Sequence, residues 1–209
     1  MALDYLLSAF VTLLVVVDPV SLAPVFAFLT RNQPPAAQRR IALNACLIAA
    51  AILGGVAVAG DWILAQLGIS LPAFRISGGL LLFALAFDMV LGWRGEREGK
   101  AAEQAVHEEH IHRIAAFPLA IPLMAGPGAI TATLLLAGRA HEDAVYISML
   151  LGIIAAVVAI CFVVYLLAGR IARLLGMIGN AVLSRVLGII LAALAVQYVI
   201  DGVRAVFRV

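Results

Sequence analysis

Two short stretches interrupt otherwise continuous apolar segments: residues 18–24 read Asp-Pro-Val-Ser-Leu-Ala-Pro, and residues 126–132 read Gly-Pro-Gly-Ala-Ile-Thr-Ala. Proline removes a backbone donor and clashes with the preceding helical turn, and glycine is a poor helix former. Each stretch therefore predicts a broken helix. The first lies in the first apolar segment of the chain and the second in the fourth.

The composition around these stretches is that of a membrane protein. Of the 209 residues, 65% are hydrophobic and only 12% are charged, and the mean hydropathy is +1.12. Soluble domains have about 25% charged residues, so the apolar excess here must face lipid. We predict an all-α integral membrane protein with six transmembrane helices, each of about 20 residues. The spans lie near residues 5–29, 41–60, 74–93, 115–138, 146–168 and 185–206.

The basic residues predict how the spans are oriented. Ten of the 14 lysines and arginines lie in the loops after spans one, three and five. The positive-inside rule makes that side cytoplasmic, which puts both termini outside a cell inner membrane. The net charge is only +2, and no basic stripe with interleaved aromatic residues is present. We therefore expect the lipid bilayer as a partner and no nucleic acid.

The two halves of the chain resemble each other weakly. Residues 18–31 align with 126–139, and residues 75–92 align with 185–202, with prolines, arginines and glycines in register. We expect a first three-helix repeat at 1–93, a charged cytoplasmic linker at 94–113 and a second repeat at 114–209. Because three is an odd number, the second repeat crosses the membrane in the opposite sense. Inverted repeats of this kind are typical of secondary transporters.

The broken helices in spans one and four predict a binding site near the bilayer midplane. Backbone groups freed inside hydrocarbon cost several kcal/mol unless protein or a water-filled cavity satisfies them. Half-helix N-termini there favour anionic groups, and unwound carbonyls favour cations. The alternative is a pair of proline kinks that only shape packing. The predicted substrate- or ion-binding residues are Asp18, Pro19, Ser21, Pro24, Gly126, Pro127, Gly128 and Thr131.

Asp18 is the strongest single candidate, because a carboxylate this deep costs at least ~2.5 kcal/mol and persists only beside a cavity or a partner. It would serve as a proton-coupling group or as a ligand for a substrate ammonium. The alternative, which does not exclude the first, is that Asp18 caps the half-helix after Pro19, since Asp before Pro is a favourable N-cap arrangement.

Five further residues form a secondary set with gating or packing roles: Arg75, Gly78, Gly79, Asp88 and Gln197. Arg75 is expected to anchor its helix end in the headgroups; the alternative is that it binds substrate or closes a gate. Asp88 pairs with a basic side chain or faces a cytoplasmic vestibule. Gln197 is more commonly an interhelical hydrogen-bonding residue, and the glycines permit close helix approach.

No metal or cofactor is expected. The histidines of residues 107–112 do not follow the helical His-Glu-x-x-His spacing of zinc enzymes, and Cys46 and Cys161 lie in separate apolar runs.

Three blocks of this sequence resemble the MarC family of bacterial and archaeal inner-membrane proteins. They are Asp18-Pro19 with Pro24, Arg75-Ile76-Ser77-Gly78-Gly79, and the run from Pro118 to Ile130 that contains Ile-Pro-Leu-Met-Ala-Gly-Pro-Gly. The resemblance covers essentially the whole chain. It implies six spans, kinship with the lysine exporter superfamily and a transport role, with a neutral amino acid transporter as the functional precedent.

The expected function is secondary transport of a small metabolite, such as a neutral amino acid, between the inverted repeats. No Walker A pattern is present, so coupling to H⁺ or Na⁺ is expected rather than direct use of ATP. An enzyme is not expected, because Asp18 has no catalytic partner motif nearby. A membrane-embedded enzyme and a structural or assembly protein are the alternatives. The small-residue faces suit packing within one chain or between copies in a homo-oligomer equally well.

Overall fold

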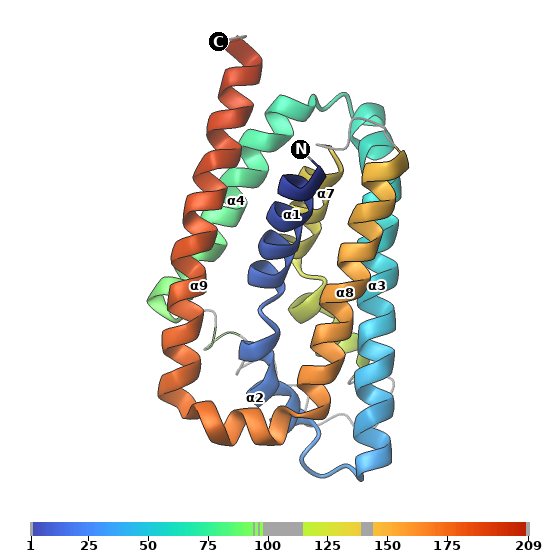
Figure 1. The fold of residues 1–209 in the computed structure, drawn as a ribbon, viewed down its shortest axis with the longest axis vertical. Coiled ribbons are helices and arrows are strands. Elements are labelled where there is room, and N and C mark those ends of the chain that lie inside the picture. Colours follow the sequence, from blue (N-terminus) through green and yellow to red (C-terminus); the bar gives the residue numbers. More distant parts are fainter. Residues whose placement is uncertain (1, 94, 96, 98–114, 139–143, 208–209) are drawn as a thin grey trace.

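The computed structural model describes residues 2–93, 95, 97, 115–138 and 144–207. These residues form helices and no strand (Figure 1). The first half contains α1 (Ala2–Val17), α2 (Pro19–Leu29), α3 (Pro35–Gln66) and α4 (Leu71–Leu91). The second half contains the π-helical segment η1 (Ala115–Met124), α7 (Pro127–Ala137), α8 (Ala144–Leu166) and α9 (Ala168–Phe207).

Five helical segments in the described part of the chain are long and apolar enough to cross a membrane: Leu3–Leu29, Pro35–Gln66, Leu71–Leu91, Ala144–Leu166 and Ile178–Phe207. The prediction of an all-helical, multi-pass architecture is therefore confirmed. The predicted fourth span is broken, as expected, into two short helices, η1 and α7, so it is not one of these five long segments. The count of six spans stays a prediction, as does the division at 94–113, most of which lies outside the described residues.

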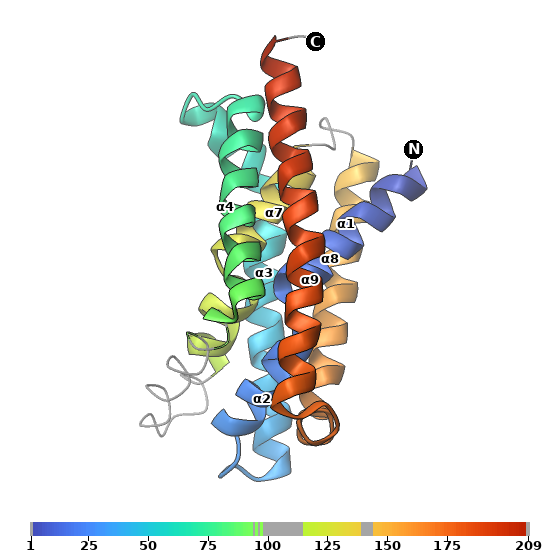
Figure 2. The same ribbon diagram turned by 90° about the vertical axis from the view of Figure 1, so that its left-hand side faces the viewer.

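Two helix pairs flank the first broken helix. α4 packs along α9, and α3 packs along α8, with α1 and α2 between the two pairs (Figure 1). The contacts agree with this view, because α2 packs against both α8 and α9. The start of α1 and the end of α9 lie at the same end of the bundle, whereas the end of α2 and the start of α3 lie at the other (Figures 1 and 2).

Glycine brings α4 and α9 close together. A Cβ atom at Gly79 would lie 2.8 Å from the Ala195 carbonyl oxygen, and one at Gly188 would lie 3.1 Å from the Ala86 carbonyl oxygen. These are backbone atoms, which cannot rotate away as a side chain can. Without side chains at these positions, the two helices approach by direct backbone contact, as is common in membrane proteins.

One expected interruption of a helix is present and another is absent. The stretch from Gly169 to Gly179 lies between the predicted spans 146–168 and 185–206, and it is interrupted at Gly176, where the backbone of α9 leaves the helical conformation. A bend at Gly176, where φ is +58°, is enough to change the chain direction there, because glycine adopts positive φ without steric cost. Pro24 lies inside α2 and does not end it. The first predicted span is therefore broken once, at Asp18.

We predict that Gly79→Ala destabilises the protein, whereas Gly55→Ala does not. The Cβ at position 79 would press on the backbone of α9, and overpacking of this kind typically costs about 1–3 kcal/mol. A Cβ at Gly55, in α3, meets nothing within 4 Å. The midpoint of thermal unfolding in detergent should fall by roughly 2–10 °C for Gly79→Ala. Equal midpoints for the two variants would contradict the close α4–α9 contact.

Candidate functional site

The first helix break is organised by Asp18. This residue adopts a left-handed conformation (φ 50°, ψ 64°) between the end of α1 at Val17 and the start of α2 at Pro19. Its Oδ1 accepts a hydrogen bond from the Ser21 N–H at 3.3 Å, which makes Asp18 the N-cap of α2. Its own N–H donates to the Leu14 carbonyl oxygen at 2.9 Å. One residue thus ends one helix and begins the next.

Capping leaves half of the Asp18 carboxyl group unused. The residue is completely buried, and its Oδ2 has no hydrogen-bond partner among the described residues. The Ser21 hydroxyl, one turn further along, likewise has none within the described part of the chain. A buried polar atom without a partner costs about 1–3 kcal/mol, and a charged one costs more. This cost marks the α1–α2 break as a candidate functional position rather than a simple kink.

The second break lies between η1 and α7. The Ala125 N–H donates to the Ala120 carbonyl oxygen at 2.9 Å, which closes the wide last turn of η1. Gly126 is the N-cap of α7 in an extended conformation, with no side-chain cap. A Cβ atom at Gly126 would collide with the Pro122 carbonyl oxygen, and one at Gly128 would collide with the Leu85 side chain. Gly126 is therefore needed where the chain passes η1, because the backbone of Pro122 cannot move aside, whereas the Leu85 side chain beside Gly128 can rotate.

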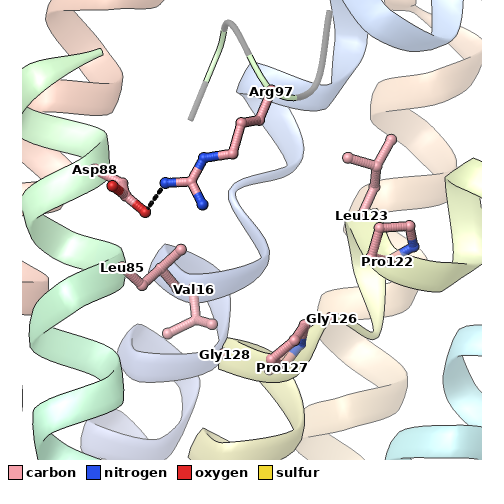
Figure 3. Close-up of a pocket in the computed structure, with 10 residues that line it drawn as sticks. Val16, Leu85, Asp88, Arg97, Pro122, Leu123, Gly126, Pro127 and Gly128 are labelled. Carbon is pink, nitrogen blue, oxygen red and sulfur yellow. Dashed lines mark ion pairs between the residues drawn. The ribbon is translucent and has the colours of Figure 1, made fainter. Parts of the chain in front are cut away.

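A cavity of about 170 Å³ opens beside this second break. Its walls come from α1, α4, the Pro122–Ala129 stretch and Arg97 (Figure 3). The two charged groups in its lining, Asp88 and Arg97, point toward each other and form an ion pair. The Asp88 side chain is 19% exposed and that of Arg97 is 65% exposed, so Arg97 is the outer member of the pair.

Only some of the predicted site residues line the cavity. Gly126, Pro127, Gly128 and Asp88 line it together. The pairing of Asp88 with a basic residue, one of the two expected arrangements, is present.

Residues from the first break do not line the cavity. Asp18, Pro19 and Ser21 form the buried start of α2, and Pro24 follows one turn later. The link between the two breaks is Val16, which lines the cavity two residues before Asp18. Its Cγ1 would lie 3.3 Å from a Cβ at Gly128. The two breaks are therefore neighbours across one packed contact.

The remaining predicted residues have packing or hydrogen-bonding contacts elsewhere. Arg75 Nη2 donates to the Gly138 carbonyl oxygen at 3.4 Å, which places a positive charge at the C-terminal end of α7, where it is favourable. Gln197 Nε2 donates to Asp201 Oδ1 at 2.7 Å on the exposed face of α9. Thr131 is buried against Gly78, since a Cβ at Gly78 would lie 2.9 Å from its Cγ2.

Sequence reasoning missed Arg97 as a site residue. It lies in the stretch that the composition assigns to a charged linker, nine residues after Asp88. The signal that would have revealed it is Gly92, which ends α4 in the left-handed conformation (φ 84°) and turns the chain at that point.

Within the described residues, no group of three or more His, Cys, Asp or Glu side chains could hold a metal ion. The histidines of 107–112 lie outside those residues.

We predict that Asp18→Asn keeps the wild-type stability whereas Asp18→Ala loses about 1–2 kcal/mol. Asparagine caps helices as well as aspartate does and tolerates positive φ, while alanine does neither. In thermal unfolding of detergent-solubilised protein, the alanine variant should melt roughly 2–8 °C below wild type. An asparagine variant that melts as low as the alanine variant would show that the negative charge, rather than the cap, holds the break together.

Comparisons with known proteins identify the family of this chain. The family model for "MarC family integral membrane protein" matches residues 3–207. A UPF0056 membrane protein of Methanocaldococcus jannaschii is 36% identical, over 98% of each chain. UPF0056 membrane proteins of Aquifex aeolicus (38% identical; 96% of this chain, 93% of that one) and Escherichia coli (YhcE; 36% identical; 95% and 91%) are similar over comparable lengths. No solved structure matches. The chain belongs to the MarC family of integral membrane proteins.

Proposed function

We propose that this protein is a secondary transporter of a small zwitterionic metabolite, a neutral amino acid, and that the cavity beside the second helix break is its substrate site. One observation carries the proposal. Two interrupted helices meet through Val16 next to a cavity whose lining holds one carboxylate and one guanidinium. Broken helices around a central cavity are the usual construction of secondary transporters.

The charges of the cavity complement an amino acid. A substrate ammonium would take the place of Arg97 beside Asp88. The substrate carboxylate would engage the Arg97 guanidinium, which suits planar carboxylates. It would also face the start of α7, where no side chain caps the free N–H groups and the helix dipole favours negative charge. Asp88 and Arg97 pair with each other in this structure. When the substrate binds, its ammonium would pair with Asp88 and its carboxylate with Arg97.

The size of the cavity favours a small ligand. A single water molecule needs roughly 10–15 Å³ of such space, and sites for drug-sized ligands measure about 300–1,000 Å³. At about 170 Å³ the cavity lies between these limits. Its apolar walls, which include Val16, Leu85 and Leu123, suit a short aliphatic side chain and offer nothing to a long charged one.

In this proposal Asp18 couples transport to an ion. Its unpartnered Oδ2 is buried at the break adjoining the cavity wall, where H⁺ or Na⁺ would satisfy it. Val16, between Asp18 and the cavity, would transmit a change at the α1–α2 break to α7. The substrate leaves chemically unchanged, so no enzymatic step is involved.

The proposed architecture is six crossings in two inverted three-helix repeats, with η1 and α7 together as the fourth crossing. Helix packing supports the pairing of the halves. In the proposed repeats α4 corresponds to α9 and α2 corresponds to α7. α4 packs on α7 and α9 packs on α2, so each contact has its equivalent in the other half. Gly79 rests on α9 near Ala195, and Gly188 rests on α4 near Ala86, in reciprocal fashion.

We further propose that the end carrying the α2–α3 connection faces the cytoplasm. Both termini would then lie outside the cell inner membrane.

Uptake of radiolabelled L-alanine into proteoliposomes, under an imposed H⁺ or Na⁺ gradient, tests the proposal. Asp88→Asn and Arg97→Gln each remove one charged hydrogen-bonding partner worth about 1.5–3 kcal/mol, so uptake at low substrate should fall at least about tenfold. Asp201→Asn and Arg204→Gln, on α9 away from the cavity, are the matched controls and should retain wild-type uptake. Propionate and ethylamine, which each carry a single charge, should compete far less well than glycine.

An exchanged variant separates substrate binding from a merely structural ion pair. Asp88→Arg combined with Arg97→Asp retains both charges but reverses their order in the cavity. If the pair only holds the fold, the exchanged variant should recover uptake. If the pair binds the zwitterion, uptake should stay low while the thermal unfolding midpoint returns to that of wild type. Uptake of alanine by wild type that ignores both gradients would refute secondary coupling.

A further inference from the structure

The first part of α9 forms an elbow across one end of the bundle. Residues 168–175 run across the bundle axis, and at Gly176 (φ +58°, ψ −172°) the chain turns to follow that axis as the long segment Ile178–Phe207 (Figure 1). Positive φ at this position suits glycine alone among the residues of the elbow. The bend is therefore encoded in the sequence, and it separates a helix across the end of the bundle from a spanning helix.

The elbow has a protein-facing side and an outer side. Ala168 is buried and Ile171 packs partly against the core, one turn apart on the same face. Arg170, Arg173 and Leu174 are exposed on the opposite side. Arg173 Nε donates to the Gly169 carbonyl oxygen at 2.9 Å, which holds its guanidinium close to the helix. Within the described part of the chain, neither arginine pairs with a carboxylate.

The length of α9 places this elbow at the lipid headgroups. Ile178–Phe207 has 30 residues, which at 1.5 Å per residue measures about 45 Å. That is the thickness of a bilayer including both headgroup layers, about 40–45 Å. When the segment spans the bilayer, the bend at Gly176 therefore lies in one headgroup layer.

The exposed apolar residues around the bend agree with that depth. Leu174 is 85% exposed and Ile178 is 82% exposed, so no part of the described protein covers these two large aliphatic side chains. They flank Gly176 on either side. An element that presents aliphatic groups and arginines together is typical of the boundary between acyl chains and headgroups.

Arginines gather at the end of the molecule that carries the elbow, which favours anionic lipid there. The α2–α3 connection and the first turns of α3, at the same end, carry exposed arginines at positions 31, 39 and 40. Of the described acidic residues, Asp18 is buried at the α1–α2 break, and Asp4, Asp61 and Asp201 lie toward the opposite end of the bundle, near the chain termini or the α3–α4 connection. The charge of Asp88 is already paired with that of Arg97. In the described chain this end is therefore basic, and it complements a negatively charged surface.

We propose that the elbow, residues 168–178, is a docking surface for anionic phospholipid. Arg170 and Arg173 bind headgroup phosphates, for which the guanidinium fork is well matched, and Leu174 and Ile178 enter the acyl-chain boundary beside them. This surface is separate from the cavity at Asp88 and does not depend on what the cavity binds.

Titration of lipid into the detergent-solubilised, full-length protein tests the proposal. The probes are dioleoyl-phosphatidylglycerol and dioleoyl-phosphatidylcholine, and the readout is the number of lipid molecules retained in native mass spectrometry. Each arginine near an anionic surface contributes about a fivefold gain in affinity, so Arg170→Gln combined with Arg173→Gln should weaken phosphatidylglycerol retention roughly 30-fold. Phosphatidylcholine retention should not change. Arg204→Gln, near the far end of α9, is the control and should bind as wild type does.

A second measurement keeps the proposal testable if the double variant folds poorly. Leu174→Cys, labelled with an environment-sensitive fluorophore, reports the polarity at the elbow in vesicles with and without phosphatidylglycerol. A blue shift that grows with phosphatidylglycerol and shrinks at high salt is expected. Equal retention of both lipids by wild type, or a label that stays in a fully aqueous environment, would overturn the proposal. So would efficient disulfide cross-linking of two unlabelled Leu174→Cys copies through the introduced thiols, which would assign the surface to a protein partner.

Discussion

A helix that ends inside hydrocarbon leaves backbone N–H and C=O groups that lipid cannot satisfy, and this constraint governs the structure more than any other. The chain meets it twice, by different means. At the first break, Asp18 supplies a side-chain acceptor to α2 and a backbone donor to α1. At the second break, the bond from the Ala125 N–H to the Ala120 carbonyl oxygen closes η1, and glycine lets α7 begin directly afterwards.

The two breaks differ in the space around them. Asp18 fills the first break with its own side chain, so the space there is packed and its surplus oxygen is enclosed. Gly126 and Gly128 bring no side chain to the second break, and the space beside it becomes the cavity. In the proposed transporter, the first break would bind the coupling ion and the cavity beside the second would bind the substrate.

Sequence patterns predicted much of this arrangement. Apolar content and helix length identified an all-helical membrane protein, and proline next to aspartate or glycine located both breaks. The pattern could not show that Pro24 leaves α2 intact, because a proline that lies one turn inside a helix is tolerated when neighbouring helices hold it. Nor could it show that the connection between the fifth and sixth predicted spans is helical on both sides of a single break, because one positive-φ glycine, Gly176, is enough to turn the chain there.

The sequence was least informative about which side chains meet. Asp18 and the Gly126–Pro127 pair occupy equivalent positions by alignment, which favours a shared site, yet the carboxylate in the cavity lining is Asp88. The reason is geometric. An N-cap side chain folds back onto its own helix to reach the N–H three residues later, and Asp18, bound to Ser21, is thereby directed along α2. Asp88 sits inside a regular stretch of α4, where its side chain projects away from the helix and is free to reach another element, in this case Arg97. Capping therefore directs the Asp18 carboxylate along its own helix and away from the cavity lining, even though one of its oxygens is left over. Where a chain breaks its helices around a cavity, the charged ligands are better sought on the intact helix that faces the break.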